Sequence, residues 1–350
     1  MHGFVANRAG DLFFMLVLVG TVSSIATVDL TYSLDLQSAV QPYISLLLLG
    51  GAAGKSAQLG LHSWLPLAIE APTPISALIH AATLVTAGVY LLVRLLPLIP
   101  GGGGEILLVS AATLLLAGLT GLAQTDLKRT IAFSTCSQVA YIVLGMGNGS
   151  PGTSLFLLFT HALYKALLFI SAGVVIHAAG NVQDTRLMGA NARVLPLSKE
   201  FFGGASLALC AFPHTAGDFS KDLLVEELGY SFLSLHQGFW LGGLGGTLLT
   251  GAYSGRLWRL IFAAEPRGVN PLPQHEPPFH LSGLLILLAA VSTLSGWLTL
   301  ELFGTSPTPS EETYLLNAEQ AMSFSSALPL LCGGSGLLLG FQAVPSQMTT

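Results

Sequence analysis

The chain has 350 residues, of which 52% are hydrophobic and only 9% are charged, and its formal net charge is −5. A soluble domain carries roughly 25% charged residues, so this composition excludes an ordinary water-exposed surface and with it a soluble globular protein. The small, dispersed charge excludes an electrostatic footprint for nucleic acid, and three widely separated cysteines exclude a disulfide framework or a metal-ligand spacing.

Apolar windows recur along the whole chain, and a helix that spans a bilayer needs about 20 apolar residues. Glycine- and proline-rich stretches such as 101–104 and 266–278 separate these windows and are poor helix formers. The pattern predicts an all-α polytopic transmembrane bundle of about ten spans. The predicted spans lie near residues 10–29, 39–61, 74–97, 105–124, 130–147, 153–178, 200–229, 236–263, 281–303 and 322–344.

The charges of the connecting loops alternate between the two sides of this arrangement. Loops on the cytoplasmic or matrix side carry an excess of lysine and arginine, so both ends of the chain are expected on that side. Arg94 alone breaks the pattern, at a span end from which a long side chain can reach the interface. The basic loop residues are Arg8, Lys128, Arg129, Arg186, Arg193, Lys199, Arg259 and Arg267, and the acidic ones are Asp29, Asp35, Glu105, Glu301, Glu311 and Glu312.

Several titratable side chains fall inside the predicted spans. A charge at the bilayer centre costs about 2.5–3.5 kcal/mol on insertion scales, so each such residue needs a partner, a cavity or a function. Lys55 follows the small residues 50–54, which favour close helix approach and local unwinding. His80 lies a few residues inside the span that opens after Pro74.

Two further positions lie later in the chain. His161 and Lys165 are four residues apart, which places both on one face of a predicted helix. Lys221 follows Pro213 and Gly217 in a segment predicted to be a broken helix, as at transporter ion sites. A desolvated lysine can exchange its proton near neutral pH, and histidine titrates there already. The candidate proton-transfer residues are therefore Lys55, His80, His161, Lys165 and Lys221.

Each candidate also has a purely structural interpretation. Lys55 can be an ion-pair partner, His80 a hydrogen-bonded core histidine, and Lys221 an interfacial residue beside Asp222. Packing alone explains the helical His–Lys pair less well, because both groups share one face in lipid. Residues 54–56 match the end of a phosphate-binding loop, but Leu49 occupies the position of its first glycine, so nucleotide binding is not expected.

Longer motifs occur in a fixed order along the chain. The main one is Gly54-Lys-Ser-Ala-Gln-Leu-Gly-Leu-His-Ser-Trp-Leu-Pro66, which continues from Glu70 to His80 and from Thr86 to Tyr90. Other motifs follow at 126–138, 160–169, 183–189, 220–222 and 252–254. Together, over residues 4–267, they resemble the antiporter-like subunit 5 of NADH dehydrogenase in respiratory complex I.

This resemblance implies a fold of two inverted repeats, each with a discontinuous helix that carries a lysine. Residues 1–97 would be the remainder of the first repeat, 98–265 the second repeat, and 266–350 the C-terminal transmembrane helices. It also implies a proton-translocating subunit of NADH:ubiquinone oxidoreductase without a redox cofactor, because electron transfer takes place elsewhere in the complex. Lys55 and Lys221 would be the central lysines, connected by His80, His161 and Lys165.

The chain also departs from the family. It resembles the subunit only from the sixth transmembrane helix onward, and the glutamate expected to pair with Lys55 belongs to an earlier helix. We therefore expect a split subunit, in which a separate chain supplies the N-terminal helices and the acidic partner of Lys55, among other complex I membrane-arm subunits. Leu157 replaces a histidine of many members, and Asp218 and His214 are additions expected to alter the protonation of Lys221.

Two other functions stay open. A multisubunit cation/proton antiporter shares the repeats and the lysines but has no redox partner, so sodium-dependent exchange would identify it, whereas copurification with iron–sulfur and quinone-binding subunits would identify complex I. A membrane scaffold with inactive lysines is the third interpretation. A fragmented gene favours the inner mitochondrial membrane over a bacterial plasma membrane.

Overall fold

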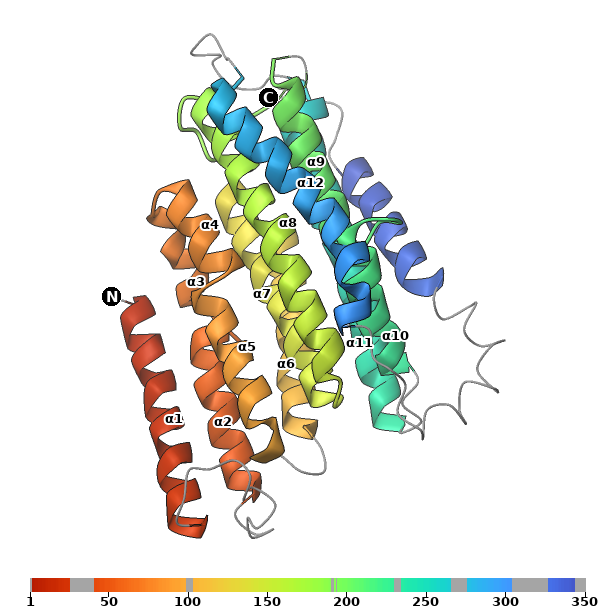
Figure 1. Ribbon diagram of the computed structural model, residues 1–350. Coiled ribbons are helices and arrows are strands. Elements are labelled where there is room, and N and C mark those ends of the chain that lie inside the picture. The colour runs from red at the N-terminus through yellow and green to blue at the C-terminus, as the bar shows by residue number, and fades with distance from the viewer. Residues whose placement is uncertain are drawn as a thin grey trace.

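The computed structural model describes residues 2–25, 41–98, 103–189, 192, 194–229, 234–265, 276–303 and 327–343. Within these ranges the chain forms a bundle of helices, which confirms the predicted all-α fold (Figure 1). The helices are α1 (His2–Ile25), α2 (Gln41–Ser56), α3 (Trp64–Leu67), α4 (Thr73–Ala81), α5 (Leu84–Leu95), α6 (Gly104–Ala123), α7 (Leu127–Gly147), α8 (Pro151–Ala178), α9 (Pro196–Leu209), α10 (Leu223–Gly229), α11 (Ser234–Trp258) and α12 (Phe279–Phe303), followed by an apolar helix over Ala327–Gln342.

Six segments of the described chain are long and apolar enough to cross a membrane. They are His2–Ser24, Thr73–Leu95, Gly104–Ala123, Leu127–Gly147, Pro151–Ala178 and Phe279–Leu300. The first begins at His2 rather than near residue 10, because the polar residues of its first turns do not interrupt the helix. The other four predicted spans correspond to α2, to α9 with α10, to α11 and to the apolar helix Ala327–Gln342.

Helix directions agree with the predicted alternation of loop charges (Figure 1). α2, α6, α8 and α11 run toward the upper end of the view, and α1, α7, α9 and α12 run toward the lower end. The upper ends therefore carry Lys128, Arg129 and Arg259, whereas Glu105 lies in the first turn of α6 at the lower end.

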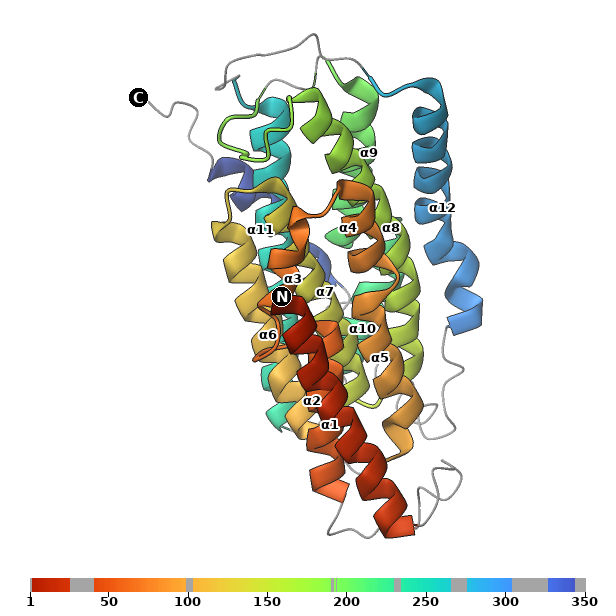
Figure 2. The ribbon, with the colours of Figure 1, turned by 90° about the vertical axis from the view of Figure 1, so that its left-hand side faces the viewer.

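α7 is the central helix of the bundle. It contacts both α6 and α8, and 94% of the residues in its most apolar 18-residue stretch are buried. In contrast, α1 and α12 lie at the periphery of the bundle, where α1 packs on α2 and α12 packs on α8 and α9; Figure 2 shows α1 in front and α12 at the right. Apart from Arg129 in the first turn, the polar side chains of α7 therefore lie inside the protein rather than toward lipid.

The predicted break within residues 200–229 is confirmed. α9 ends at Leu209, and Ala211 and His214 then adopt left-handed backbone conformations with φ of 58° and 64°. A π-helical turn over Asp218–Asp222 leads into α10. Gly217 lies directly against the carbonyl of Ala208, where a Cβ atom would overlap it, so the turn requires glycine at this position.

The local unwinding predicted for the Lys55 helix lies just after Lys55 and not at the glycines of residues 50–54. α2 stays regular through this stretch and ends at Ser56, and the left-handed residue is Ala57, with φ of 51°. The small residues serve close packing instead, because Gly54 lies against Gly10 of α1. The expected span 74–97 contains a break that the sequence did not predict, between α4 and α5.

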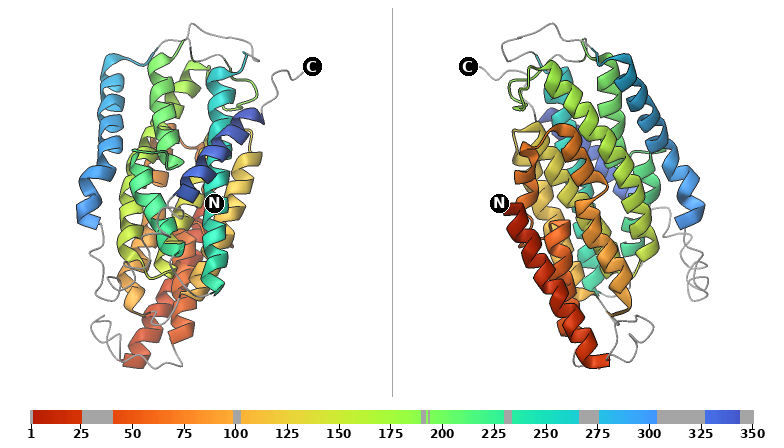
Figure 3. Two further views of the ribbon diagram at one scale, coloured as in Figure 1. Left: turned by 90° about the vertical axis from the view of Figure 1, so that its right-hand side faces the viewer. Right: turned by 60° about the vertical axis from the view of Figure 1, so that its left-hand side comes forward.

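Small residues also bring the apolar helix Ala327–Gln342 onto α11 (Figure 3). Cβ atoms at Gly336 and Gly340 would overlap the backbone carbonyls of Leu248 and Ala252. Contacts between such small residues let helices approach closely in a membrane, where packing drives helix association.

Candidate functional site

The interior of the bundle holds a cluster of titratable side chains from two helices. α8 supplies His161 and Lys165, α4 supplies His80, and all three side chains are fully buried. Lys165 lies close enough to both histidines to interact with them electrostatically. Its Nζ donates a hydrogen bond of 2.5 Å to Oγ of Ser134 on α7. The structure therefore brings three of the predicted site residues together.

Aromatic rings hold the two histidines of this cluster. The His80 ring stacks on Phe169 with centroids 4.9 Å apart, and the His161 ring meets the edge of Tyr164 at 5.5 Å. Within the described part of the chain, neither imidazole has a hydrogen-bond partner for either nitrogen. Ring packing thus fixes both side chains while all four nitrogen atoms stay available for proton exchange.

Lys221 lies on the π-helical turn that follows the break after α9. Its ammonium donates to the carbonyl oxygen of Leu209 at 3.4 Å and lies 5.0 Å from the centroid of the Tyr141 ring. The last carbonyls of a helix lack intrahelical partners and form the negative end of the helix dipole, so the end of α9 attracts the ammonium group. Among the described residues, Lys221 and Lys165 have no carboxylate within ion-pair distance, although the buried Asp222 interacts electrostatically with Lys221.

A hydrogen bond joins the π-helical turn to α8. The Ser220 hydroxyl lies 2.7 Å from that of Thr160, and these two residues directly precede Lys221 and His161 in the chain. Both hydroxyls are buried. The two lysine positions therefore belong to one connected polar region, although they lie on separate elements.

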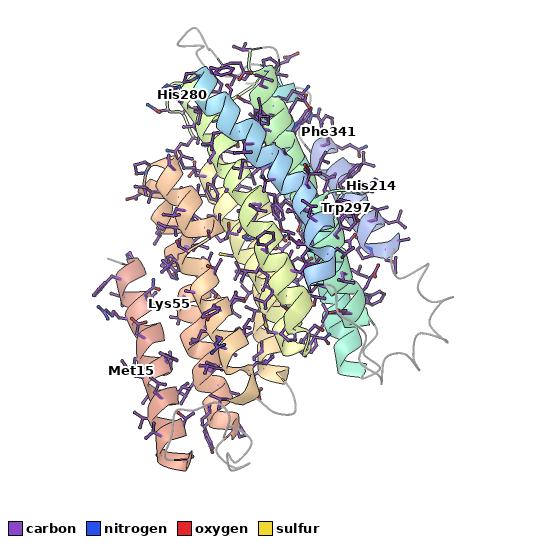
Figure 4. The ribbon with its side chains drawn as sticks, in the orientation of Figure 1. Met15, Lys55, His214, His280, Trp297 and Phe341 are labelled. Atoms are coloured by element: carbon purple, nitrogen blue, oxygen red, sulfur yellow. The ribbon has the colours of Figure 1, made fainter. Side chains whose placement is uncertain are left out.

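Lys55 occupies a different place, between α1 and α2 at the edge of the bundle (Figure 4). Its Nζ forms an ion pair of 2.7 Å with Oδ1 of Asp11, and the lysine side chain is 28% exposed. The contact of Gly10 with Gly54 brings these two charges within reach of each other. Lys55 thus has an acidic partner in its own chain, whereas the expectation of an acid from a separate chain stays a prediction.

The added residues near Lys221 have a local role in the structure. The backbone N–H of His214 donates to Oδ2 of Asp218 at 2.8 Å, which satisfies a donor in the strained turn. Asp218 also interacts electrostatically with Asp222. The expected effect of Asp218 and His214 on the protonation of Lys221 stays a prediction.

Three contact residues of the site were not singled out from the sequence: Asp11, Ser134 and Tyr141. Asp11 had a signal, since it is an acidic residue beside a glycine in the predicted span that precedes Lys55. No comparable sequence signal marks Ser134 or Tyr141 as a site residue, because serine and tyrosine are common in transmembrane helices. Only the tertiary contacts of these two residues distinguish them.

Outside the membrane-spanning helices, backbone hydrogen bonds join the segment before α7 to the loop after α8. The backbone N–H of Leu127 donates to the carbonyl of Gln183 at 2.9 Å, and Asp126 pairs with Asp184 across an isolated antiparallel bridge. The Arg186 guanidinium donates to Asp184 at 2.7 Å, and this hydrogen bond lowers the pKa of the Asp184 carboxyl from its ordinary value. The segment between α6 and α7 is thus held against the loop that follows α8.

Comparison with known proteins identifies relatives along most of the chain. The profile of the family described as "NADH:quinone oxidoreductase/Mrp antiporter, TM" matches residues 1–248. The chain is 43% identical over 311 residues to NADH-ubiquinone oxidoreductase chain 5 of Metridium senile, which covers 86% of this chain and 52% of the relative. The protein of the same name from Triticum aestivum is 38% identical over 371 residues, which covers 97% of this chain and 55% of the relative. The chain therefore spans about half the length of the curated relatives that it matches.

The fold also has a match among solved structures. One chain of the Mrp complex from Dietzia sp. DQ12-45-1b superposes with a TM-score of 0.74 and 24% sequence identity. The superposition covers 97% of this chain and 38% of the other. At this identity the similarity shows a shared fold and no more.

Proposed function

Because the chain belongs to the NADH:quinone oxidoreductase/Mrp antiporter family of membrane proteins, we propose that its buried lysines and histidines carry protons across the membrane. The burial of Lys165, His80 and His161 in one cluster is the observation that carries this proposal. Charged groups in a bilayer are expensive, and these have only neutral hydrogen-bond or aromatic partners among the described residues. Reversible protonation explains why such groups are present.

We assign the five residues to successive stages of proton transfer. Lys55 and Asp11 form an ion pair at the edge of the bundle, which is the first stage. Lys165 exchanges protons with His80 and His161, its electrostatic neighbours. Lys221 holds its proton against the end of α9 and releases it from there.

The setting of this activity is the membrane arm of a respiratory NADH:ubiquinone oxidoreductase. The relatives named NADH-ubiquinone oxidoreductase chain 5 support this assignment over a cation/proton antiporter. Other membrane-arm subunits are then the partners, and electron transfer takes place elsewhere in the complex, so this chain needs no redox centre. The same names favour the mitochondrial inner membrane. We also propose that the two repeats divide between residues 97 and 98, and that the C-terminal part of the chain starts at residue 266.

The experiment is proton pumping in membrane vesicles that carry the assembled complex. Lys165→Ala and Lys221→Ala are each expected to lower NADH-driven pumping about a hundredfold at unchanged complex content, because a positioned proton carrier contributes factors of this size. Lys199→Ala is the matched control, since Lys199 lies in the first turns of α9, is partly exposed and pairs with Glu200 at 3.3 Å.

The outcomes separate the three functions. Loss of NADH-driven pumping in both buried variants, with the Lys199 variant unchanged, supports the proposal. Full pumping in the buried variants would make the chain a scaffold. Sodium-dependent proton exchange that persists in vesicles without NADH would identify a cation/proton antiporter.

A further inference from the structure

One face of α7 contacts Lys165 at one end and Lys221 at the other. Ser134 accepts the hydrogen bond of Lys165, and Tyr141 lies under the ammonium of Lys221. These two positions are seven residues apart, and Gln138 lies between them, one helical turn after Ser134. The three side chains therefore follow each other along α7 in the order in which a proton would pass them.

Ser134 and Tyr141, at the two ends of this face, lie too far apart for a proton to pass directly from one lysine position to the other. Seven residues of α-helix span about 10 Å at 1.5 Å per residue. A proton moves between heavy atoms that lie about 2.6–3.2 Å apart. At least one intermediate station is thus required between Lys165 and Lys221.

Tyr253 of α11 lies beside this stretch of α7 between Ser134 and Tyr141. Its hydroxyl faces Ser134, Gln138 and Thr250, yet none of these contacts has the geometry of a formed hydrogen bond. Tyr253 also neighbours Tyr141 electrostatically, and the phenol is 1% exposed. Its hydroxyl therefore lies beside the residues that hold both lysines.

Gln138 is the second unexplained group. Its side chain is fully buried, and among the described residues neither its amide oxygen nor its amide nitrogen has a hydrogen-bond partner. Leaving such a group unpaired costs about 1–3 kcal/mol, and buried polar groups in proteins normally pair with protein or with ordered water. If Gln138 served only to fill space, methionine or leucine could take its place without this penalty.

We propose that Gln138 and Tyr253 are positioning residues that hold a hydrogen-bonded bridge, with water as its other member, between Lys165 and Lys221. This inference rests on the proposed proton transport and adds the connection between its two lysines. An amide and a phenol suit the task because each both donates and accepts hydrogen bonds.

Transfer along the bridge moves one proton in total. The Lys165 ammonium gives a proton to the nearest oxygen of the bridge, each O–H then passes its own proton to the next acceptor, and the neutral amine of Lys221 takes the last one. Lys165 is left as an amine and Lys221 becomes an ammonium group. The Gln138 amide keeps its protons and orients the bridging oxygens.

The test is a set of variants in vesicles that carry the assembled complex. Tyr253→Phe removes one oxygen atom, and Gln138→Met removes the amide at nearly equal volume. Each is expected to lower NADH-driven pumping about tenfold per assembled complex, which is the effect of one lost hydrogen bond of ordinary strength on a rate. Thr135→Val is the matched control, because Thr135 is equally buried on α7, but its hydroxyl bonds only the carbonyl of Ile131 among the described residues.

A second measurement separates positioning from packing. The ratio of pumping rates in H₂O and D₂O should rise in Tyr253→Phe and Gln138→Met, because proton transfer becomes slower than the other steps. A packing defect lowers complex content and leaves this ratio unchanged. If Gln138→Met fails to assemble, Tyr253→Phe alone decides.

The same series distinguishes failure of this inference from failure of the proposed function. Unchanged pumping and an unchanged isotope ratio in Tyr253→Phe, while Lys165→Ala and Lys221→Ala abolish pumping, would overturn the bridge and leave the proton carriers in place. Full pumping in the two lysine variants would overturn both.

Discussion

Asp11 gives Lys55 a charged partner, which the other buried lysine positions lack in the described part of the chain. The pair is partly exposed, so its contribution to stability is small, about 0–1 kcal/mol. Its effect is expected on proton transport instead. Asp11→Asn removes the carboxylate that lies 2.7 Å from the Lys55 ammonium and should slow pumping several-fold, which is roughly the effect of 1 kcal/mol on a rate.

A charge-conserving variant provides the control for this prediction. Asp11→Glu should keep most of the pumping rate, and complex content should be equal in both variants. Equal pumping by Asp11→Asn and the unaltered protein would mean that the ion pair has no part in transport.

At the membrane surface, Asp184 is expected to make stability depend on pH. The hydrogen bond from Arg186 lowers the pKa of Asp184 in the folded protein, so the pair stabilises the fold above the ordinary range of the carboxyl, near pH 4. This contribution is lost as the pH falls through the lower, folded pKa. Asp184→Asn should therefore lower the thermal unfolding midpoint in detergent at pH 7, and the difference should disappear in strong acid. A difference that persists at the lowest pH would contradict the charge-based explanation.

The discontinuous helix is the element on which the Lys221 position depends. Gly217→Ala would place a methyl group against the carbonyl of Ala208, and forced overpacking of this kind costs about 1–3 kcal/mol. We expect a lower thermal midpoint and less assembled complex. Gly204→Ala on α9 is the matched control, because a Cβ atom at that glycine would meet nothing within 4 Å. Equal midpoints in the two variants would show that the break tolerates a side chain.

Some elements were predictable from local sequence and others were not. Apolar windows predicted the long spans because hydropathy acts over each helix by itself, and Pro213 with Gly217 predicted the break before Lys221. The break between α4 and α5 carries no glycine or proline, so only tertiary packing reveals it. The glycines before Lys55 misled because small residues serve both unwinding and close packing, and here they pack against α1.

The site likewise contains some contacts that local sequence predicts and others that depend on tertiary packing. Helical spacing alone placed His161 beside Lys165, whereas the approach of His80 on α4 and of Ser134 on α7 depends on how separate helices pack. Asp11 could have been found from the sequence, because it is an acidic residue inside the predicted span that precedes Lys55. Gln138 and Tyr253 lie within the motifs 126–138 and 252–254, but only the folded structure shows that both are buried without hydrogen-bond partners among the described residues.

Across the whole molecule, burial increases from the edge of the bundle to its centre. Lys55 lies near the exposed face of α1, where Met15 points away from the protein (Figure 4), while Lys165 and Lys221 are fully buried around the central helix α7. The helix directions place the basic loop residues of the described chain at one end of the bundle. One polar region thus extends inward from a surface pair to two enclosed lysines.

The central claim is that Lys165 and Lys221 release and regain protons rather than supply fixed positive charge. Arginine keeps the charge but does not release its proton in proteins, so Lys165→Arg and Lys221→Arg test the claim directly. NADH-driven pumping per assembled complex is predicted to be lost in both variants and retained in Lys199→Arg. Pumping at the unaltered rate in either buried arginine variant would contradict the account.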